Sequence, residues 1–190
     1  MMPSSETGQA SSRVSLFSHE DVAAIAARRG WLPPAGVAAE QEMEATARRQ
    51  WMAQAAQLLG AQAADRGALE FLLERVFQYD ACENLARPEN QAVMAREGAR
   101  QVLRELAPLV LGPAEVDSDR YKEIVAALKE HTGRRGQELF HPVRLALAGR
   151  AGEGEFDRVI LLLDGAARLA WNVPVKSCRQ RIIEFCATMD

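Results

Sequence analysis

Aromatic and β-branched residues are scarce in this chain of 190 residues, and no stretch is apolar enough to cross a membrane. Aromatic residues make up 6% of the sequence, while alanine and leucine are abundant. This balance favours helices, because strands are rich in β-branched and aromatic residues. The run of large apolar side chains at residues 159–163 is far shorter than the roughly 20 residues that a membrane-spanning helix needs. We therefore expect no membrane partner.

Cysteines are also few, and their number fits neither a disulfide framework nor a metal site. The three cysteines are Cys82, Cys178 and Cys186. An odd number without metal-type spacing is typical of reduced thiols in a cytoplasmic protein. Residues 1–12 lack the basic start and apolar centre of a secretory signal, so we expect residues 1–14 to be a disordered tail.

The residue patterns of common catalytic sites are missing as well. The three histidines lie far apart in the sequence, and Gly149, Gly152 and Gly154 do not have the spacing of a dinucleotide-binding loop. Carboxylate pairs such as Glu153 and Glu155 are more typical of solvated turns than of acid–base catalysis. We expect no catalytic residue, no metal and no cofactor.

Charge is unevenly distributed along the chain. The net charge is −3, but residues 129–181 contain ten Lys or Arg residues against six Asp or Glu residues. A positive C-terminal third on an acidic body is compatible with a polyanionic partner. The alternative is that arginine-rich helices are simply soluble, and charge alone leaves both interpretations open.

Hydrophobic periodicity and capping signals predict an all-α protein. Helices are expected at about residues 19–29, 38–59, 66–79, 88–106, 117–131, 142–148 and 155–163, and from residue 174 onwards. We expect the last helix to turn Ile182 and Ile183 inwards and to carry a basic face at Lys176, Arg179 and Arg181. No segment shows the two-residue alternation of a strand. Pro108, Gly112 and Pro113 interrupt the helical pattern, so we expect an N-terminal helical subdomain at residues 15–112 and a C-terminal one at residues 113–190.

The most distinctive stretch reads LFHPVRLALAGR at residues 139–150, preceded by a basic loop, KEHTGRRG, at residues 129–136. Pro142 is expected to begin a helix, whose free backbone N–H groups favour anions. Arg144 then lies one turn inside, where a planar guanidinium can contact a phosphate or a base edge. Phe156 is available to stack on an unpaired base, and single-stranded RNA loops present such bases. The alternatives are a capping or salt-bridged Arg144 and a Phe156 that only fills the core.

This stretch resembles the C-terminal anticodon-binding region of bacterial glutamyl-tRNA synthetases, over residues 117–165. The family pattern is K/G-x-L-F-x-P-L-R-x-A-L-T-G, followed by a turn, a small helix and a Leu-Leu-Gly stop. The matching residues are Phe140, Pro142, Arg144, Ala146, Leu147 and Gly149. Val143 replaces Leu, Ala148 replaces Thr, and the stop reads LLDG at residues 162–165. The resemblance implies a helical bundle or cage of the class I glutamyl-tRNA synthetase anticodon-binding type.

The resemblance also implies which residues contact RNA. They are the motif arginine and the turn that follows it: Arg144, Glu153, Gly154 and Phe156. Three basic residues nearby are further candidates for RNA contacts by their charge and position: Arg150, Arg134 and Arg135. Arg134 and Arg135 are either phosphate contacts or part of a solvated turn. The acidic Glu153 and Glu155 depart from the family, which has Thr or Ser and then Pro in this turn.

The resulting hypothesis is a non-catalytic domain that binds the anticodon loop of a tRNA, of the glutamate type. The catalytic half of the synthetases, with its H-x-G-H and K-M-S-K-S type signatures, does not occur in these residues. We therefore expect that the chain does not charge tRNA unaided and that a separate synthetase chain is a second candidate partner. A C-terminal piece of a longer ligase is one alternative. A helical protein-interaction module that kept the fold and lost RNA binding is another.

Overall fold

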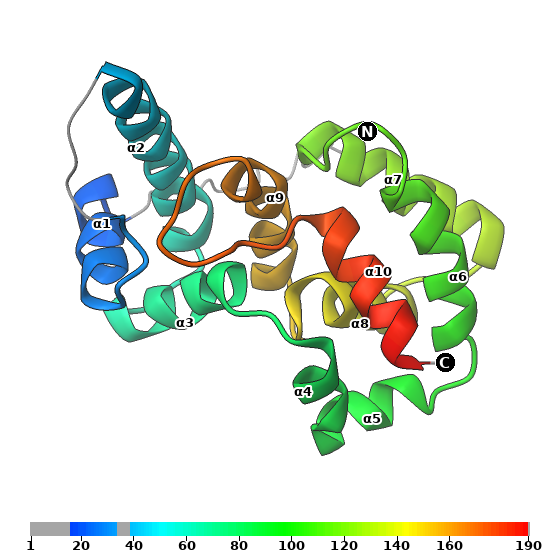
Figure 1. The fold of residues 1–190 in the computed structure, drawn as a ribbon. Helices are drawn as coiled ribbons and strands as arrows, with labels where there is room; N and C mark the ends of the chain where they lie inside the picture. Colours follow the sequence, from blue (N-terminus) through cyan, green and yellow to red (C-terminus); the bar gives the residue numbers. More distant parts are fainter. Residues whose placement is uncertain (1–15, 34–38, 190) are drawn as a thin grey trace, which may run out of the picture.

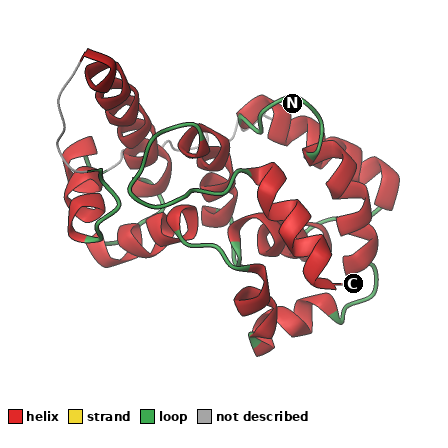
Figure 2. Ribbon diagram, viewed as in Figure 1, coloured by secondary structure: helices red, strands yellow, loops and turns green. Residues whose placement is uncertain are grey.

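The structure, a computed structural model, describes residues 16–33 and 39–189, and every regular element within these ranges is a helix (Figure 2). The helices are α1 (His19–Arg28), α2 (Ala39–Gly60), α3 (Arg66–Phe77), α4 (Ala81–Ala86), α5 (Pro88–Met94), α6 (Ala99–Val110), α7 (Ser118–Thr132), α8 (Gln137–Ala148), α9 (Glu155–Ala167) and α10 (Cys178–Met189). The predicted all-α class is confirmed. The tail predicted at residues 1–14 lies outside the described residues.

The helices form two groups that meet at α9 (Figure 1). α1, α2 and α3 lie at one end, and α4 to α8 lie with α10 at the other. α9 packs against α2 and α3 on one side and against α8 on the other, while α6 packs against α7, α8 and α10. Buried apolar side chains from Val22 to Phe185 form one continuous core. The division at residues 112/113 stays a prediction, and helices from both sides of it pack together.

Several helices begin where capping residues predict. Asp65 Oδ1 accepts a hydrogen bond from the backbone N–H of Ala68 at 2.8 Å, and α3 starts at the next residue. Asp117 Oδ1 accepts from the N–H of Arg120 at 2.8 Å at the start of α7. Each carboxylate satisfies an N–H that has no partner inside its helix.

The helix expected at residues 88–106 is in fact two helices. Gly98 has φ = +83°, a conformation that a helix interior does not contain, and it separates α5 from α6. α6 then continues through Pro108, which was expected to end the pattern, as far as Val110. Pro108 lies near the end of α6 with an exposed side chain, where water can bond the carbonyl that it leaves unpaired.

The last helix begins four residues later than expected. Its start is not Pro174 but Cys178, because Ser177 and Gln180 cap it: the N–H of Ser177 donates to Gln180 Oε1 at 2.8 Å, and the N–H of Gln180 donates to Ser177 Oγ at 3.2 Å. The expected faces change as well. Ile183, expected inside, is 52% exposed, whereas Arg181, expected on the basic outer face, is fully buried.

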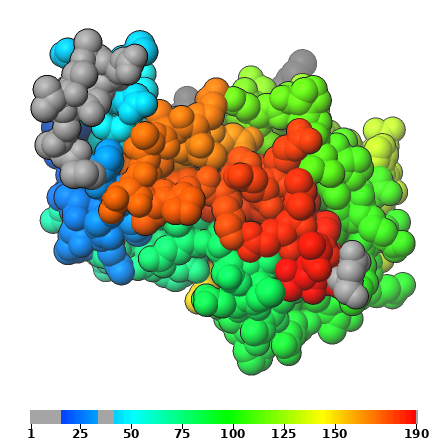
Figure 3. Space-filling view, viewed as in Figure 1, coloured from blue at the N-terminus to red at the C-terminus, as the bar shows by residue number. Residues whose placement is uncertain are grey.

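The segment between α9 and α10 crosses the surface from the α1–α2 end towards α10 (Figure 3). Trp171 anchors it, with its ring centroid 5.1 Å from that of Trp51 and 4.9 Å from that of Phe77, both edge-on. The N–H of Asn172 donates to the carbonyl of Trp31 at 2.8 Å. The segment therefore ties the N-terminal helices to the C-terminal ones.

Candidate nucleic-acid interface

The turn at residues 149–154 joins α8 to α9 and is the centre of the expected site. Gly149 ends α8 with φ = +79°, and a Cβ atom there would lie 2.7 Å from Nδ2 of Asn84. Only glycine fits without strain. The side-chain amide of Asn90 donates to the carbonyl of Asn84 at 2.7 Å and, more weakly, to that of Gly149 at 3.4 Å. The start of the turn is therefore held by α4 and α5.

Arg144, the arginine of the motif, is only 7% exposed. Its Nε donates to Oδ1 of Asp157 at 2.8 Å and its Nη2 donates to Oδ2 at 2.7 Å, a two-pronged ion pair. Its Nη1 donates to the carbonyl of Gly152 at 2.7 Å. Tyr121 Oη donates to Oδ1 of the same aspartate at 2.7 Å. The guanidinium thus joins α8, the turn and the first turn of α9, and all three of its nitrogens are used.

The charge of Arg144 is stable in this position. Burial by itself lowers the pKa of Arg144, but the hydrogen bonds and the negative charge of Asp157 outweigh burial and raise this pKa above its usual value. The ring of Phe140 lies beneath the guanidinium, with its centroid 5.0 Å from Cζ. The sequence left open whether Arg144 contacts RNA or is a capping or salt-bridged residue, and the geometry matches a salt-bridged arginine.

The helix that carries Arg144 starts earlier than expected. α8 begins at Gln137 after Gly136, so Pro142 lies inside the helix instead of at its start. The free N–H groups are accordingly at the basic loop, and the N–H groups of Leu139 and Phe140 bond to the carbonyl of Gly136. Because a helix rises 1.5 Å per residue, this basic loop and the turn lie about 18 Å apart, at opposite ends of α8.

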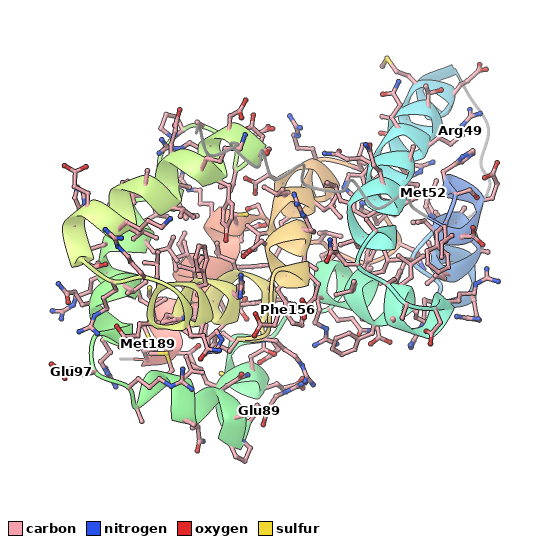
Figure 4. The ribbon with its side chains drawn as sticks, turned by 180° about the vertical axis from the view of Figure 1, so that it is seen from behind. Arg49, Met52, Glu89, Glu97, Phe156 and Met189 are labelled. Carbon is pink, nitrogen blue, oxygen red and sulfur yellow. The ribbon has the colours of Figure 1, made fainter. Side chains whose placement is uncertain are left out.

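Phe156 lies beneath the turn and is 4% exposed. Its ring packs so closely on Gly152 that a side chain at position 152 would collide with it. Its ring meets that of Phe71 of α3 edge-on, with the centroids 6.3 Å apart. Figure 4 labels Phe156 near the start of α9. In this geometry Phe156 supports the turn from the core side.

The other residues expected at the turn do reach the surface. Glu153 and Gly154 are exposed at its tip, and Arg150 is half-buried, with its guanidinium 5.3 Å from the ring centroid of Phe71. Beside the tip lies a hollow of about 280 Å³, whose lining includes Tyr121, Gly154 and Asp157. The exposed Lys122 and Arg158 stand at its rim.

The basic loop forms a separate surface. Arg135 is exposed, while Arg134 packs over Gly98 and pairs with Glu138 at 3.3 Å. Arg134 lines a groove of about 480 Å³ together with Arg100 and Arg104, among other residues of α6. The structure therefore brings together five of the seven expected residues at the turn and places the other two at the far end of α8.

Sequence reasoning missed the partners of Arg144. Asp157 has the appearance of an ordinary helix-start acid, which the helix dipole explains by itself. Its separation of 13 residues from Arg144 is no helical repeat, and Tyr121 is 36 residues away from it. The sequence held one indication of this role: Asp157 directly follows the apolar Phe156, so it lies close to the side of α9 that faces the core.

Other kinds of site find no support among the residues that the structure describes. No three His, Cys, Asp or Glu side chains within residues 16–33 and 39–189 are grouped so as to hold a metal ion. In the same ranges, no helix is long and apolar enough to span a membrane.

Relatives of this chain are found among glutamate–tRNA ligases. It is 40% identical over 76 residues to glutamate–tRNA ligase 2 of Syntrophus aciditrophicus, a match that covers 40% of the chain and 16% of that ligase. It is 34% identical over 105 residues to glutamate–tRNA ligase 2 of Gluconacetobacter diazotrophicus, covering 55% of the chain and 22% of the ligase. The matched part is thus less than a quarter of each of these two ligases. No solved structure matches significantly.

The family comparison agrees with the motif and with the all-helical fold. The family described as the anticodon binding domain matches residues 38–163, which include the turn, Arg144 and Asp157. The matched range is well over half of the 190 residues, and the two relatives described above are glutamate–tRNA ligases. The chain therefore belongs to the anticodon binding domain family, of the glutamyl-tRNA synthetase type.

Proposed function

We propose that this chain binds the anticodon loop of a tRNA, of the type that accepts glutamate, and that it acts by binding alone. The observation that carries the proposal is the turn at residues 149–154. The buried pair of Arg144 and Asp157 holds this turn in place, and the turn presents Arg150, Glu153 and Gly154 to solvent. A rigid support with an exposed polar tip suits the recognition of unpaired bases.

Each residue of the site has a different task in this proposal. Arg150 contacts phosphate, which contributes affinity without reading sequence. Glu153 carries a carboxylate, which accepts hydrogen bonds from the amino groups of bases. Gly154 has no side chain, so a base can approach the hollow beside Tyr121. Phe156 and Arg144 act through the turn by holding its backbone.

The surface at the other end of α8 extends the contact. Arg134 and Arg135 precede α8 and lie close to its free N–H groups, which favour anions. In our proposal they bind phosphates of the same RNA, about 18 Å from the turn. We further propose that the chain works in the cytoplasm and that a separate synthetase chain is its second partner.

The test is binding of fluorescent anticodon stem-loops, measured by anisotropy across a salt series. We expect the glutamate stem-loop to bind more tightly than stem-loops of equal length with other loop sequences. Glu153→Gln should change the ranking of the loops, whereas Glu130→Gln, which removes an exposed carboxylate from α7, should not. Equal binding of all loops at every salt concentration would refute glutamate specificity.

One observation favours a different function. The tip of the turn carries the exposed acid Glu153, followed by Glu155, and the chain has a net charge of −3. A protein-interaction module derived from the same fold would show these features. It would bind no stem-loop even at low salt, and after nuclease treatment it would retain a purified glutamate–tRNA ligase in a pull-down.

A further inference from the structure

Two arginines from separate parts of the chain lie against one aromatic ring next to the turn, and a third arginine is near one of them. The guanidinium carbon of Arg75, on α3, lies 5.2 Å from the ring centroid of Phe71, and that of Arg150, in the turn, lies 5.3 Å from it. Arg87, between α4 and α5, is close enough to Arg75 to act on its charge. Burial lowers the pKa of Arg75, Glu74 raises it, and the charges of Arg150 and Arg87 lower it further.

The positive charge of this cluster is poorly compensated. Arg75 pairs with Glu74 at 3.5 Å, but Glu74 also holds Arg29 of α1. The side chains of Arg87 and Arg150 make no ion pair or hydrogen bond with any residue in the described ranges. The Nε atoms of Arg75 and Arg150 are buried and have no hydrogen-bond partner there. Like charges held together in this way repel, and buried donors without acceptors cost free energy.

We propose that Arg75 and Arg150, which both lie against the ring of Phe71, bind phosphodiester groups of the RNA strand that passes the turn, together with the nearby Arg87. The inference rests on the proposed function and adds to it a backbone-binding site that lies largely outside the motif. Guanidinium groups suit phosphate oxygens because their N–H groups form paired, charge-assisted hydrogen bonds. Arg150 belongs to both the turn and the cluster, so one strand can reach both.

The cluster is partly organised before RNA arrives. The side chain of Arg75 is only 11% exposed and lies against Phe71, so little freedom remains to be lost on binding. Phe71 itself meets Phe156 beneath the turn. A phosphate seated on the cluster is therefore at a defined place relative to Glu153 and Gly154. Such contacts position an RNA and do not read its sequence.

The experiment compares two double variants that remove the same charge. Arg87→Gln with Arg150→Gln removes two cluster arginines whose side chains make no ion pair in the described structure, so folding should be preserved. Arg49→Gln with Arg179→Gln removes two exposed arginines from α2 and α10. The probes are the glutamate anticodon stem-loop, a stem-loop with a scrambled loop, and oligouridylate, each measured between 50 and 200 mM salt.

We expect the cluster variant to lose affinity for all three probes and to keep the wild-type preference between the two loops. Losing two phosphate contacts should reduce the slope of log K against log salt by about 1.4, since each single-strand contact contributes about 0.7. The ratio of the wild-type binding constant to that of the cluster variant should therefore fall about sevenfold between 50 and 200 mM salt. The control variant should lose less affinity at low salt and follow the wild-type slope more closely.

The outcomes separate this inference from the proposed function. A cluster variant with the slope and affinity of the control refutes the phosphate site, even where the wild type still prefers the glutamate loop. A wild type without loop preference, whose binding of oligouridylate nevertheless depends on Arg87 and Arg150, refutes the anticodon specificity and supports the phosphate site. A wild type that binds none of the three probes refutes both.

Discussion

Replacing Asp157 by Asn should destabilise the fold strongly, because it leaves the buried charge of Arg144 without its partner. Arg144 is 7% exposed and the side chain of Asp157 is 21% exposed, so solvent screens this pair only weakly. The substitution keeps the size of the side chain and removes its charge. Tyr121, which donates to Oδ1 of Asp157, can still donate to the new amide oxygen.

The expected cost follows from the geometry of the pair. Removing one partner of a buried ion pair costs about 3–5 kcal/mol, because the remaining charge stays desolvated. The amide oxygen of Asn can accept one of the two bonds that Arg144 donates, at 2.8 and 2.7 Å in the native protein. The lower end, about 3 kcal/mol, is therefore the expected loss in the free energy of unfolding. Arg144→Met combined with Asp157→Asn should cost less than the sum of the single variants, with a coupling of about 2 kcal/mol.

Urea unfolding followed by circular dichroism and tryptophan fluorescence measures these differences. Asp119→Asn is the control, since Asp119 pairs with Lys122 at 2.8 Å but both side chains are exposed, and exposed pairs contribute little. Two results would show that the carboxylate of Asp157 does not hold Arg144. One is a loss of unfolding free energy in Asp157→Asn as small as in this control, and the other is additivity of the losses from Arg144→Met and Asp157→Asn. The positioning role that we give Arg144 would then be wrong.

Three further predictions concern other parts of the structure. Gly149→Ala should lower the free energy of unfolding by about 2 kcal/mol in urea titrations, because it strains a positive φ and pushes Cβ against Asn84; no measurable change would mean that the turn is loose. Arg181→Met should cost about 3 kcal/mol in the same assay, since it takes the donor from four carbonyls in buried or partly buried hydrogen bonds. A loss below about 1 kcal/mol would show that water replaces the guanidinium. Burial raises the pKa of both tyrosines, Tyr79 and Tyr121, above the usual 10.0, so about one pH unit above that value the native protein should show far less tyrosinate absorbance than the urea-unfolded chain. Because the unfolded tyrosines lose their protons first, their contribution to stability is complete below pH 10.0 and declines above it, and equal absorbance in both states would contradict this burial.

Local signals predicted the helices and failed where a contact from elsewhere in the chain decides the outcome. Asp65 and Asp117 each bond to a backbone N–H only three residues further along the chain, so these caps can be recognised from the local sequence. α3 and α7 start directly after them. Arg181 is different, because its surroundings are carbonyls of Arg75, Val76, Leu147 and Lys176, which only the folded chain brings together. A pattern of alternating basic and apolar residues cannot reveal such a cage, so Arg181 was expected on the outer face.

At the start of α10 the error came from two local signals that compete with each other, and not from a distant contact. Ser177 and Gln180 have the spacing of a capping box and were legible in the sequence, but Pro174 competes with them as a helix start. The structure uses the side-chain cap. The proline instead lies in the segment that carries Trp171 across the surface towards α10.

At the site, the motif predicted where the turn is but not which side chains face solvent. The spacing from Phe140 to Gly149 specifies a helix that ends in a left-handed glycine, and the structure contains it. Whether Arg144 points outwards depends on Asp157, which lies beyond the turn, and no periodicity links the two. Phe156 is likewise buried by its contact with Phe71 of α3, a helix outside the motif.

These contacts separate two tasks, which are shaping the turn and binding a polyanion. The motif residues Arg144 and Gly149 are used up in shaping the turn, since the arginine donates to Asp157 and to the carbonyl of Gly152. In our proposal, the charge left for a polyanion comes from Arg150 and from outside the motif, at Arg75, Arg87, Arg134 and Arg135. The shape of the turn can therefore persist while its exposed tip changes, and the acidic Glu153 is such a change. Substitutions at that tip should alter which loop is preferred without altering stability, whereas substitutions at Asp157 should do both.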